Sequence, residues 1–206
     1  YADRVLKNQL STKEERLIGF PQSYEMYLRS LAAISATISA SEQSWNYGIS
    51  ATISGGTHHA YRDRGEGFCV FNDVAVAIQF LKKSNPNLRA FIIDLDVHQG
   101  NGTAAVFQND PKVFTFSIHG EKNYPFRKEI SDFDISLPPE TNDDVYLFEL
   151  SLYLLPLIEK YKPDILFYNA GVDILKEDKL GSLHISSKGC YERDLTVLSI
   201  SRRLEI

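Results

Sequence analysis

The sequence predicts an α/β fold, a three-layer αβα arrangement in which helices cover both faces of a central, mostly parallel β-sheet. Short segments of almost continuous apolar residues alternate with longer helical segments, and this alternation is typical of a parallel sheet. The polar motifs follow directly after the apolar segments. In sheets of this class, ligands bind beyond the carboxyl ends of the strands, so we expect the functional residues there.

The first half of the chain is predicted to contribute two helices and two strands. Residues 22–42 are expected to form a mostly buried helix, and residues 49–54 a short strand that ends at a pair of glycines. Asp73 can cap a helix that ends before Pro86, because the apolar residues between them recur on one face. Residues 90–93 are uniformly apolar and are expected to form a buried strand.

The second half continues the alternation from Thr103 onwards. We expect helices over residues 103–108, 145–161 and 187–203, and strands over residues 113–117 and 165–168. Pro156 is expected to kink the middle one of these helices, since proline cannot donate the hydrogen bond of the helical ladder. The last strand stops at Asn169, again at a polar residue.

Length and composition indicate one globular domain over residues 1–206. Hydrophobic residues make up 43% and charged residues 24% of the chain, an ordinary balance for a soluble domain. The sequence begins at Tyr1 without a methionine and closes on Leu-Glu-Ile. We therefore expect the domain to be incomplete at both ends.

Charge and cysteine content indicate which kinds of binding partner and which cellular compartment to expect. The formal net charge is −5, which argues against direct nucleic-acid binding because that usually requires a basic surface. No apolar run approaches the roughly 20 residues that span a bilayer, so we expect no membrane partner. Two cysteines are too few for a disulfide framework and favour a reducing, intracellular compartment. We expect the cytoplasm in a bacterium, and the nucleus or cytoplasm in a eukaryote.

Polar residues at every second position follow the apolar segment, in the order Asp94, Asp96, His98. Side chains two apart on an extended segment point the same way, so these could line one side of the strand end. Zn²⁺ accepts aspartate oxygen and histidine nitrogen, and a catalytic zinc site takes three protein ligands and a water. This segment readily offers two ligands, so a third must come from elsewhere. The loop after residues 165–168 offers Asp173, Glu177 and Asp178.

Two other interpretations of this motif stay open. The aspartates could cap the strand end beside a hydrogen-bonded histidine, without a metal. Phosphatases of the haloacid dehalogenase type also place Asp-x-Asp after an apolar strand, and they would use Mg²⁺ and an aspartyl-phosphate on Asp94. Their motif has threonine or valine two residues after the second aspartate, where this chain has His98, which argues against that interpretation.

A second polar motif, Gly-Gly-Thr-His58-His59, follows the predicted strand over residues 49–54. The glycines permit a tight turn and a close approach of the backbone to a ligand. Histidine titrates near neutral pH, so one of the pair could take a proton from a metal-bound water while the other holds positive charge. The alternative is a loop dipeptide with one exposed and one structural histidine. His119 and His184 have no comparable neighbours and are expected to be structural.

With these motifs the chain resembles the zinc-dependent histone deacetylase family, from about Ser44 to its end. The family has the arginase/deacetylase fold, which agrees with the expected αβα architecture. The motifs in the family's order and spacing are Gly55-Gly-Thr-His58-His59-Ala, Gly67-Phe68-Cys69 with Asn72-Asp73, Asp94-x-Asp96-x-His98, Ala170-Gly171-x-Asp173 and Asp178-x-Leu180-Gly181. Gln99-Gly-Asn101-Gly and Asn169-Ala-Gly-Val-Asp-Ile-Leu are most similar to the class IV branch and its bacterial relatives.

The resemblance implies two cation sites. Asp96, His98 and Asp178 match the family's zinc ligands, which favours Asp178 over Asp173 as the third ligand, and Fe²⁺ is an alternative to Zn²⁺. A monovalent-cation site, usually K⁺, is also implied. Its matching groups are the backbone carbonyls of Asp94, Asp96 and His98, together with Ser117 and Ile118.

The resemblance also implies catalytic roles for the histidine pair. His58 and His59 match the tandem catalytic histidines, and Asp94 matches the carboxylate that hydrogen-bonds the first of them. Asn101 stands where many relatives carry an aspartate bonded to the second. An amide cannot stabilise an imidazolium as a carboxylate does, so His59 is expected to be less basic here.

A substrate tunnel is the third implied feature. Gly67 and Phe68 match one wall of the family's acyl-lysine tunnel. Tyr124 is expected to supply the opposite wall, where relatives often have phenylalanine. The alternative for both aromatic residues is plain core packing.

The implied activity is hydrolysis of a linear amide C–N bond, which removes acetyl or other acyl groups from lysine side chains of proteins or peptides by a metal-activated water. An acylated small amine such as an acetylpolyamine is the alternative substrate, and a non-catalytic acyl-lysine-binding homologue is the alternative of another class. The family's oxyanion-stabilising tyrosine lies in a glycine-rich segment beyond the last helix, and this sequence stops before it. Turnover is expected to be poor without such a donor, whose loss typically costs about 100- to 1000-fold in rate.

Overall fold

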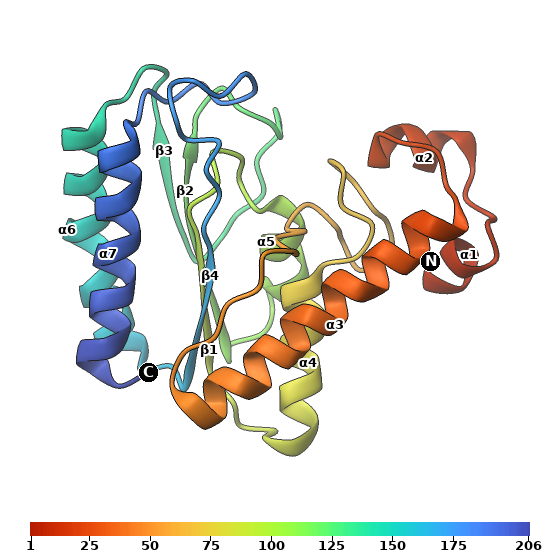
Figure 1. Cartoon of the computed structure of the whole chain (residues 1–206), viewed down its shortest axis with the longest axis horizontal. Helices are drawn as coiled ribbons and strands as arrows, with labels where there is room; N and C mark the ends of the chain where they lie inside the picture. The colour runs from red at the N-terminus through yellow and green to blue at the C-terminus, as the bar shows by residue number, and fades with distance from the viewer. The chain divides into compact units, whose positions relative to one another are not determined.

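The structure, a computed structural model, describes all 206 residues in seven helices, four strands and the segments between them (Figure 1). The helices are α1 (Ala2–Leu6), α2 (Thr12–Ile18), α3 (Tyr24–Tyr47), α4 (Asp73–Ser84), α5 (Asn101–Phe107), α6 (Asp143–Tyr161) and α7 (Ser187–Leu204). The strands are β1 (Ala90–Asp94), β2 (Val113–Gly120), β3 (Phe133–Leu137) and β4 (Ile165–Asn169). The chain divides into two compact units: unit 1 is Tyr1–Asn87 with Asn101–Val106, and unit 2 is Leu88–Gly100 with Phe107–Ile206. That both belong to one domain stays a prediction.

Unit 2 is built on a four-stranded sheet in the order β3-β2-β1-β4, and all three strand pairs are parallel. The last residue of β1, Asp94, is in register with Ser117 of β2 and with Asn169 of β4. Because parallel strands all end at the same edge, the polar residues that follow β1 and β4 leave the sheet side by side. The parallel sheet agrees with the predicted α/β class.

Helices α6 and α7 lie next to each other along one face of this sheet (Figure 1). α6 turns a buried stripe to the sheet, because its buried residues recur every four positions on one side of the helix. They are Tyr146, Leu150, Leu154 and Ile158. These side chains join Phe91 and Ile93 of β1 in one hydrophobic cluster, in which the ring of Phe91 stacks on Phe114 with centroids 4.7 Å apart.

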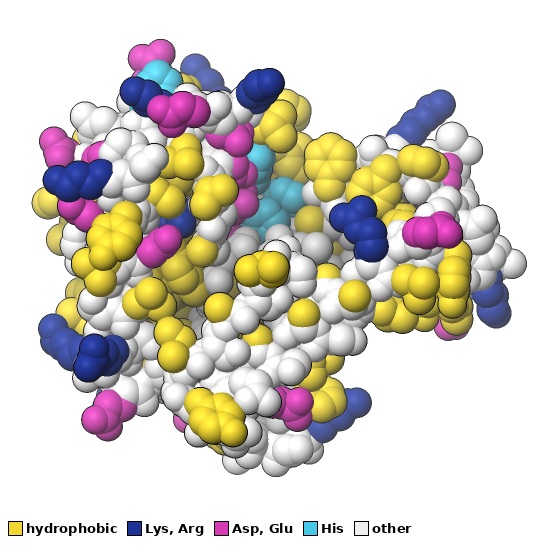
Figure 2. Space-filling model, viewed as in Figure 1, with side chains coloured by type: hydrophobic (Ala, Val, Ile, Leu, Met, Phe, Trp, Pro, Cys, Tyr) yellow, Lys and Arg dark blue, Asp and Glu magenta, His cyan; other side chains and the backbone are white.

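The opposite side of this helix layer is partly apolar. Figure 2 shows hydrophobic side chains on the surface over α7, and the exposed apolar residues of this helix are Tyr191, Leu195 and Leu198.

No helix of the structure combines the length and the apolarity that crossing a membrane requires.

Unit 1 contains α1 to α4, the segments that join them, and all but the last residue of α5. α2 begins with a capping box, in which the Ser11 hydroxyl accepts from the backbone N–H of Glu14 and the Glu14 carboxylate accepts from that of Ser11. α4 begins at Asn72, whose side-chain oxygen accepts from the backbone N–H of Ala75 at 2.9 Å. The predicted helix before Pro86 is therefore confirmed, with Asn72 rather than Asp73 as its cap.

Two predictions about elements in unit 1 are wrong. Residues 49–54 form no strand and are exposed, because no neighbouring strand pairs with their backbone. α3 is longer than residues 22–42, and only Met26, Thr37 and Ser41 of it are buried, so it is not a mostly buried helix. Several of its large apolar side chains, among them Tyr24, Leu28 and Leu31, are exposed instead.

Three elements were not predicted: α1, α2 and β3. β3 alternates partly buried apolar residues with exposed Asp134 and Ser136, as expected for a strand at the edge of a sheet. The sequence does not predict this strand, because it is short, contains an aspartate and is flanked by residues that favour turns.

The core assignment gives a stability prediction. Phe91→Ala should lower the free energy of unfolding by about 3–5 kcal/mol, because the ring has no exposed surface and its removal leaves a cavity. Phe126→Ala makes the same chemical change at a ring that is 91% exposed, and should alter that free energy by less than about 0.5 kcal/mol. Urea unfolding followed by circular dichroism measures both, and similar losses in the two variants would contradict the assignment.

Candidate metal centre and histidine pair

The carboxyl ends of β1 and β4 set the starting points of two loops in unit 2. The backbone N–H of Leu95 donates to the carbonyl of Asn169 at 3.1 Å, which extends the parallel pairing one residue beyond Asp94. Asp94 is buried, and its Oδ1 accepts from Nδ2 of Asn169 at 3.0 Å and from the backbone N–H of Asp96 at 3.3 Å. Both loops therefore leave the sheet from fixed, neighbouring positions.

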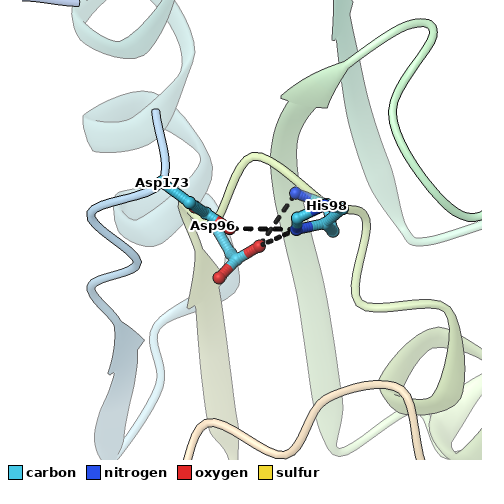
Figure 3. Close-up of side chains that lie close together, drawn as sticks. All are labelled: Asp96, His98 and Asp173. Atoms are coloured by element: carbon cyan, nitrogen blue, oxygen red, sulfur yellow. Dashed lines mark hydrogen bonds and ion pairs between the residues drawn. The ribbon is translucent and has the colours of Figure 1, made fainter. Parts of the chain in front are cut away.

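Just beyond these strand ends, Asp96, His98 and Asp173 form a cluster (Figure 3). Asp96 and His98 come from the loop after β1, and Asp173 comes from the loop after β4. Nδ1 of His98 lies 3.0 Å from Oδ1 of Asp96 and 2.9 Å from Oδ2 of Asp173. Each residue offers a ligand atom within 4.8 Å of those of the other two, a spacing that suits three ligands of one ion.

Backbone groups hold the two carboxylates in place. Oδ1 of Asp96 accepts from the backbone N–H of His98 at 2.8 Å, and Oδ1 of Asp173 accepts from that of Val97 at 2.9 Å. Gly171 allows the two loops to approach, because a Cβ atom there would lie 2.5 Å from Oδ2 and 2.7 Å from Cα of Asp96. A larger residue at this position would push the loop that carries Asp173 away.

The donor set fits a catalytic divalent metal. Two carboxylate oxygens and an imidazole nitrogen are ligands that Zn²⁺ accepts, and three protein ligands leave a position for water or substrate. The same set suits Fe²⁺. Burial alone would lower the pKa of His98, but its hydrogen bonds with Asp173 and Asp96 raise that pKa to about 9. A metal ion that binds here would therefore displace a proton from His98 at neutral pH.

Asp178, which the resemblance matched to the third zinc ligand, does not belong to this cluster. It is exposed, and its Oδ1 accepts from the backbone N–H groups of Leu180 at 2.7 Å and Gly181 at 3.0 Å. The Asp178 carboxylate thus closes its own turn. The number of residues from the strand end could have favoured Asp173, because it stands only four residues after β4 ends at Asn169.

The residues matched to a monovalent-cation site lie at the ends of β1 and β2. Ser117 and Ile118 are buried, and Ser117 is in register with Asp94. Oγ of Ser117 lies 3.0 Å from Nδ1 of His119, whose pKa is lowered to about 4 by burial. His119 is therefore neutral at pH 7, in agreement with a structural role. The cation itself stays a prediction.

Tyr124 lies in the loop of residues 121–132 between β2 and β3, and its ring packs edge-on against Phe126 with centroids 6.4 Å apart. Lys128 organises this loop from within, because its ammonium donates to three backbone carbonyls. The acceptors are Glu121 at 3.2 Å, Asn123 at 2.6 Å and Pro125 at 2.8 Å. An ammonium has three donors, so each of them has an acceptor.

In unit 1, Asp73 at the start of α4 holds the turn that precedes His58. Its buried carboxylate accepts four hydrogen bonds. They come from the backbone N–H of Gly56 at 3.3 Å, the N–H and hydroxyl of Thr57 at 2.8 and 2.6 Å, and the hydroxyl of Thr37 at 2.6 Å. Nothing in the sequence pattern links Asp73 to a turn 16 residues earlier.

The two imidazole rings of the histidine pair follow this turn directly. His58 and His59 are both buried, and their ring centroids are 4.1 Å apart with the planes at 46°. A loop dipeptide with one exposed histidine does not describe this arrangement. The two rings are close enough to share a proton-transfer task.

The neighbours of Asn101 fix the tautomer of His59. Nδ2 of Asn101 donates to the hydroxyl of Tyr61 at 3.0 Å and to Oε1 of Glu66 at 3.2 Å. The amide oxygen is therefore the atom that faces Nδ1 of His59, at 2.6 Å. An amide oxygen only accepts, so Nδ1 of His59 carries a hydrogen and Nε2 is the nitrogen that can take up a proton. Sequence reasoning gave no part in this to Tyr61 or Glu66.

Gly67 and Phe68 present an aromatic ring from a strained loop. Phe68 has a φ angle of 65°, in the left-handed region that non-glycine residues rarely adopt, and its ring is 67% exposed. The loop packs directly on the histidine pair, because a Cβ atom at Gly67 would lie 2.6 Å from Cδ2 of His59. The ring stacks on Phe20 with centroids 6.3 Å apart and is not part of the buried core, and its contact with a substrate stays a prediction.

Comparison with known proteins identifies relatives over most of the chain. The histone deacetylase domain model matches residues 2–206. An uncharacterized protein of Picosynechococcus sp. is 43% identical over 97% of this chain, and histone deacetylase 2 of Arabidopsis thaliana is 35% identical over 84% of it. The crystal structure of an HDAC homologue from Aquifex aeolicus matches 98% of this chain with a TM-score of 0.85 and 27% sequence identity.

The chain spans 66% of the Picosynechococcus protein, 46% of the Arabidopsis protein and 60% of the Aquifex chain. The structural likeness confirms the predicted α/β, arginase/deacetylase-like fold class. Because the domain model covers the chain from residue 2 to residue 206, the protein belongs to the histone deacetylase family.

Proposed function

We propose that this protein is a metal-dependent amidohydrolase that removes acetyl or other acyl groups from lysine side chains of proteins. The observation that carries the proposal is the cluster of Asp96, His98 and Asp173, in a chain of the histone deacetylase family. Family membership also removes the reason to consider an aspartyl-phosphate on Asp94.

In this proposal Asp96, His98 and Asp173 hold Zn²⁺, with Fe²⁺ as the alternative ion. When bound, the ion supplies a Lewis acid for a carbonyl oxygen and lowers the pKa of a bound water to about 7. The two carboxylates and a neutral imidazole carry two negative charges, which balance a doubly charged cation. The backbone N–H groups of Val97 and His98 keep the carboxylates oriented before the ion arrives.

His59 is the proposed general base. Its Nδ1 donates to Asn101, so Nε2 takes a proton from the attacking water and returns it to the leaving amine. Asn101 orients the ring without adding a negative charge beside it. His58, with Asp94 as its proposed partner, stabilises the charge that develops during the reaction.

The substrate class is inferred from the aromatic residues and from the family. Gly67, Phe68 and Tyr124 are proposed to contact the methylene chain of the acylated lysine, since the exposed ring of Phe68 and the half-buried ring of Tyr124 offer apolar surface to such a chain. K⁺ at the backbone carbonyls of the strand ends is proposed as structural support. Its groups are those of Asp94, Asp96 and His98, with Ser117 and Ile118.

The proposal is tested with the purified, Zn²⁺-loaded protein and a peptide that contains acetyl-lysine. His59→Ala should lower kcat/KM about 100- to 10,000-fold, the usual contribution of a general acid–base group. His184→Ala is the matched control, because His184 is exposed and lies outside the proposed site. Hydrolysis that survives His59→Ala would show that another group is the base.

The same assay separates the alternative functions. An acetylpolyamine that is hydrolysed faster than the peptide would assign the protein to small acylated amines. Binding of the acylated peptide without any hydrolysis would leave a non-catalytic acyl-lysine-binding function.

The third metal ligand is tested by comparing two aspartates of one loop. Asp173→Asn should weaken Zn²⁺ binding more than about 100-fold, because losing a ligand costs more than the 10- to 100-fold of an outer-shell change. Asp178→Asn removes the same charge and should leave the affinity within about threefold, since its carboxylate closes a separate turn. Competition with a chromogenic chelator measures both. A larger loss in Asp178→Asn would restore Asp178 as the ligand.

The neutral partner of His59 predicts the pH dependence of an Asn101 variant. Asn101→Asp places a carboxylate beside the imidazole, which should raise the pKa of His59 and move the acidic limb of kcat/KM upward by about one pH unit. The comparison is made in a Glu66→Gln background, because Asn101 also bonds the Glu66 carboxylate, which would repel the new aspartate. An unmoved acidic limb would mean that His59 does not titrate as the base.

A further inference from the structure

Arg193 of α7 is the only arginine in the chain that is buried, with 0% of its surface exposed. A guanidinium stays charged even in the protein interior, so its partners must replace the water that it loses. The proposed chemistry gives Arg193 no task, and a residue of this kind in a helix is usually found at the surface. Its contacts therefore indicate what the charge is for.

The guanidinium divides its donors between one carboxylate and two backbone carbonyls. Nε and Nη2 lie 2.8 and 2.7 Å from Oδ1 of Asp194, which balances the charge. Nη1 donates to the carbonyl oxygens of Leu95 at 3.2 Å and Gly171 at 2.5 Å. Asp194 is held in turn by the hydroxyl of Tyr168 on β4, at 2.5 Å.

The two carbonyls belong to the two loops of the candidate metal centre. Leu95 directly precedes Asp96, and Gly171 stands two residues before Asp173. Both lie just beyond the paired residues of β1 and β4. The guanidinium thus joins the two segments of the chain at the point where the pairing of β1 with β4 stops and the loops with the proposed ligands begin.

We infer that Arg193 is a positioning residue that fixes the spacing of Asp96 and Asp173 by binding the carbonyls that precede them. The inference rests on the proposed function, which gives that spacing its use. The planar guanidinium can bind both groups at once, with Nη1 on the two carbonyls while Nε donates to Asp194 and Nη2 lies in ion-pair distance of the same carboxylate. A lysine ammonium at this position would keep the charge but make only part of these contacts.

Three variants separate this role from a general contribution to stability. Arg193→Met removes the charge and every donor while keeping an unbranched side chain. Arg193→Lys returns the charge without the planar fork. Val197→Ala is the control, because Val197 lies one turn further along α7, is 2% exposed and belongs to the same core, but has no polar contact to either loop.

The first measurement is hydrogen exchange of the backbone N–H of Val97 in the metal-free protein, because this group donates to Asp173 at 2.9 Å. It is made at urea concentrations that give the variants equal free energies of unfolding. Val97 should then exchange about tenfold faster in Arg193→Met than in Val197→Ala, since only the former loosens the loop locally. Equal exchange in the two variants overturns the inference.

The second measurement is Zn²⁺ affinity by chelator competition. Arg193→Met should bind Zn²⁺ about 10- to 100-fold more weakly than the wild type, as outer-shell changes do in other metal sites. Arg193→Lys should fall between them, and Val197→Ala should match the wild type. An affinity for Arg193→Met equal to that for Val197→Ala contradicts the positioning role. A wild-type protein that binds no Zn²⁺ refutes the proposed metal centre instead, and the exchange of Val97 then decides whether Arg193 fixes the spacing.

Discussion

The parallel pairing of β1 with β4 is the constraint on which the candidate site depends. Its register places Asp94 beside Asn169, although 75 residues separate them along the chain. His98 and Asp173 each stand four residues beyond these strand ends. Side chains on a strand alternate between its two faces, so a register slip of one residue would separate the loops that carry the proposed ligands.

The main chain, as well as the side chains, shapes this cluster. Backbone N–H groups of Val97 and His98 bind the carboxylates, and the carbonyls of Leu95 and Gly171 bind a buried guanidinium. The two backbone N–H groups thus point to the candidate metal site, and the two backbone carbonyls point to the core. Because these bonds form during folding, little rearrangement is left for the moment at which an ion or substrate binds.

Sequence patterns predicted the parts of this protein that depend on local chemistry. The apolar run of β1 predicted a buried strand, which is confirmed. Asp96 and His98 lie together just beyond it, and their role as metal ligands stays a prediction. The sequence did not show that Asp173, rather than Asp178, lies beside Asp96 and His98, because loop spacing does not reveal which carboxylate turns back to the strand. Arg193 gave no signal, since an arginine in a helical pattern looks like a surface residue until the fold buries it.

The segment 49–54 shows the limit of the same reasoning. Its composition favours a strand, but a strand needs a neighbour, and the partner is a property of the whole fold rather than of the six residues. β3 is the reverse case, because its pairing with β2 makes a strand of residues whose composition is ambiguous.

Lys128 gives the loop that carries Tyr124 a cation of its own. Its ammonium sits among the carbonyls of Glu121, Asn123 and Pro125, a place that a dissolved ion could otherwise occupy. Because the Lys128 ammonium is covalently part of the chain, dilution or dialysis cannot remove it. The three carbonyls of this loop are therefore satisfied by a donor that belongs to the chain itself, without a contribution from dissolved potassium or sodium.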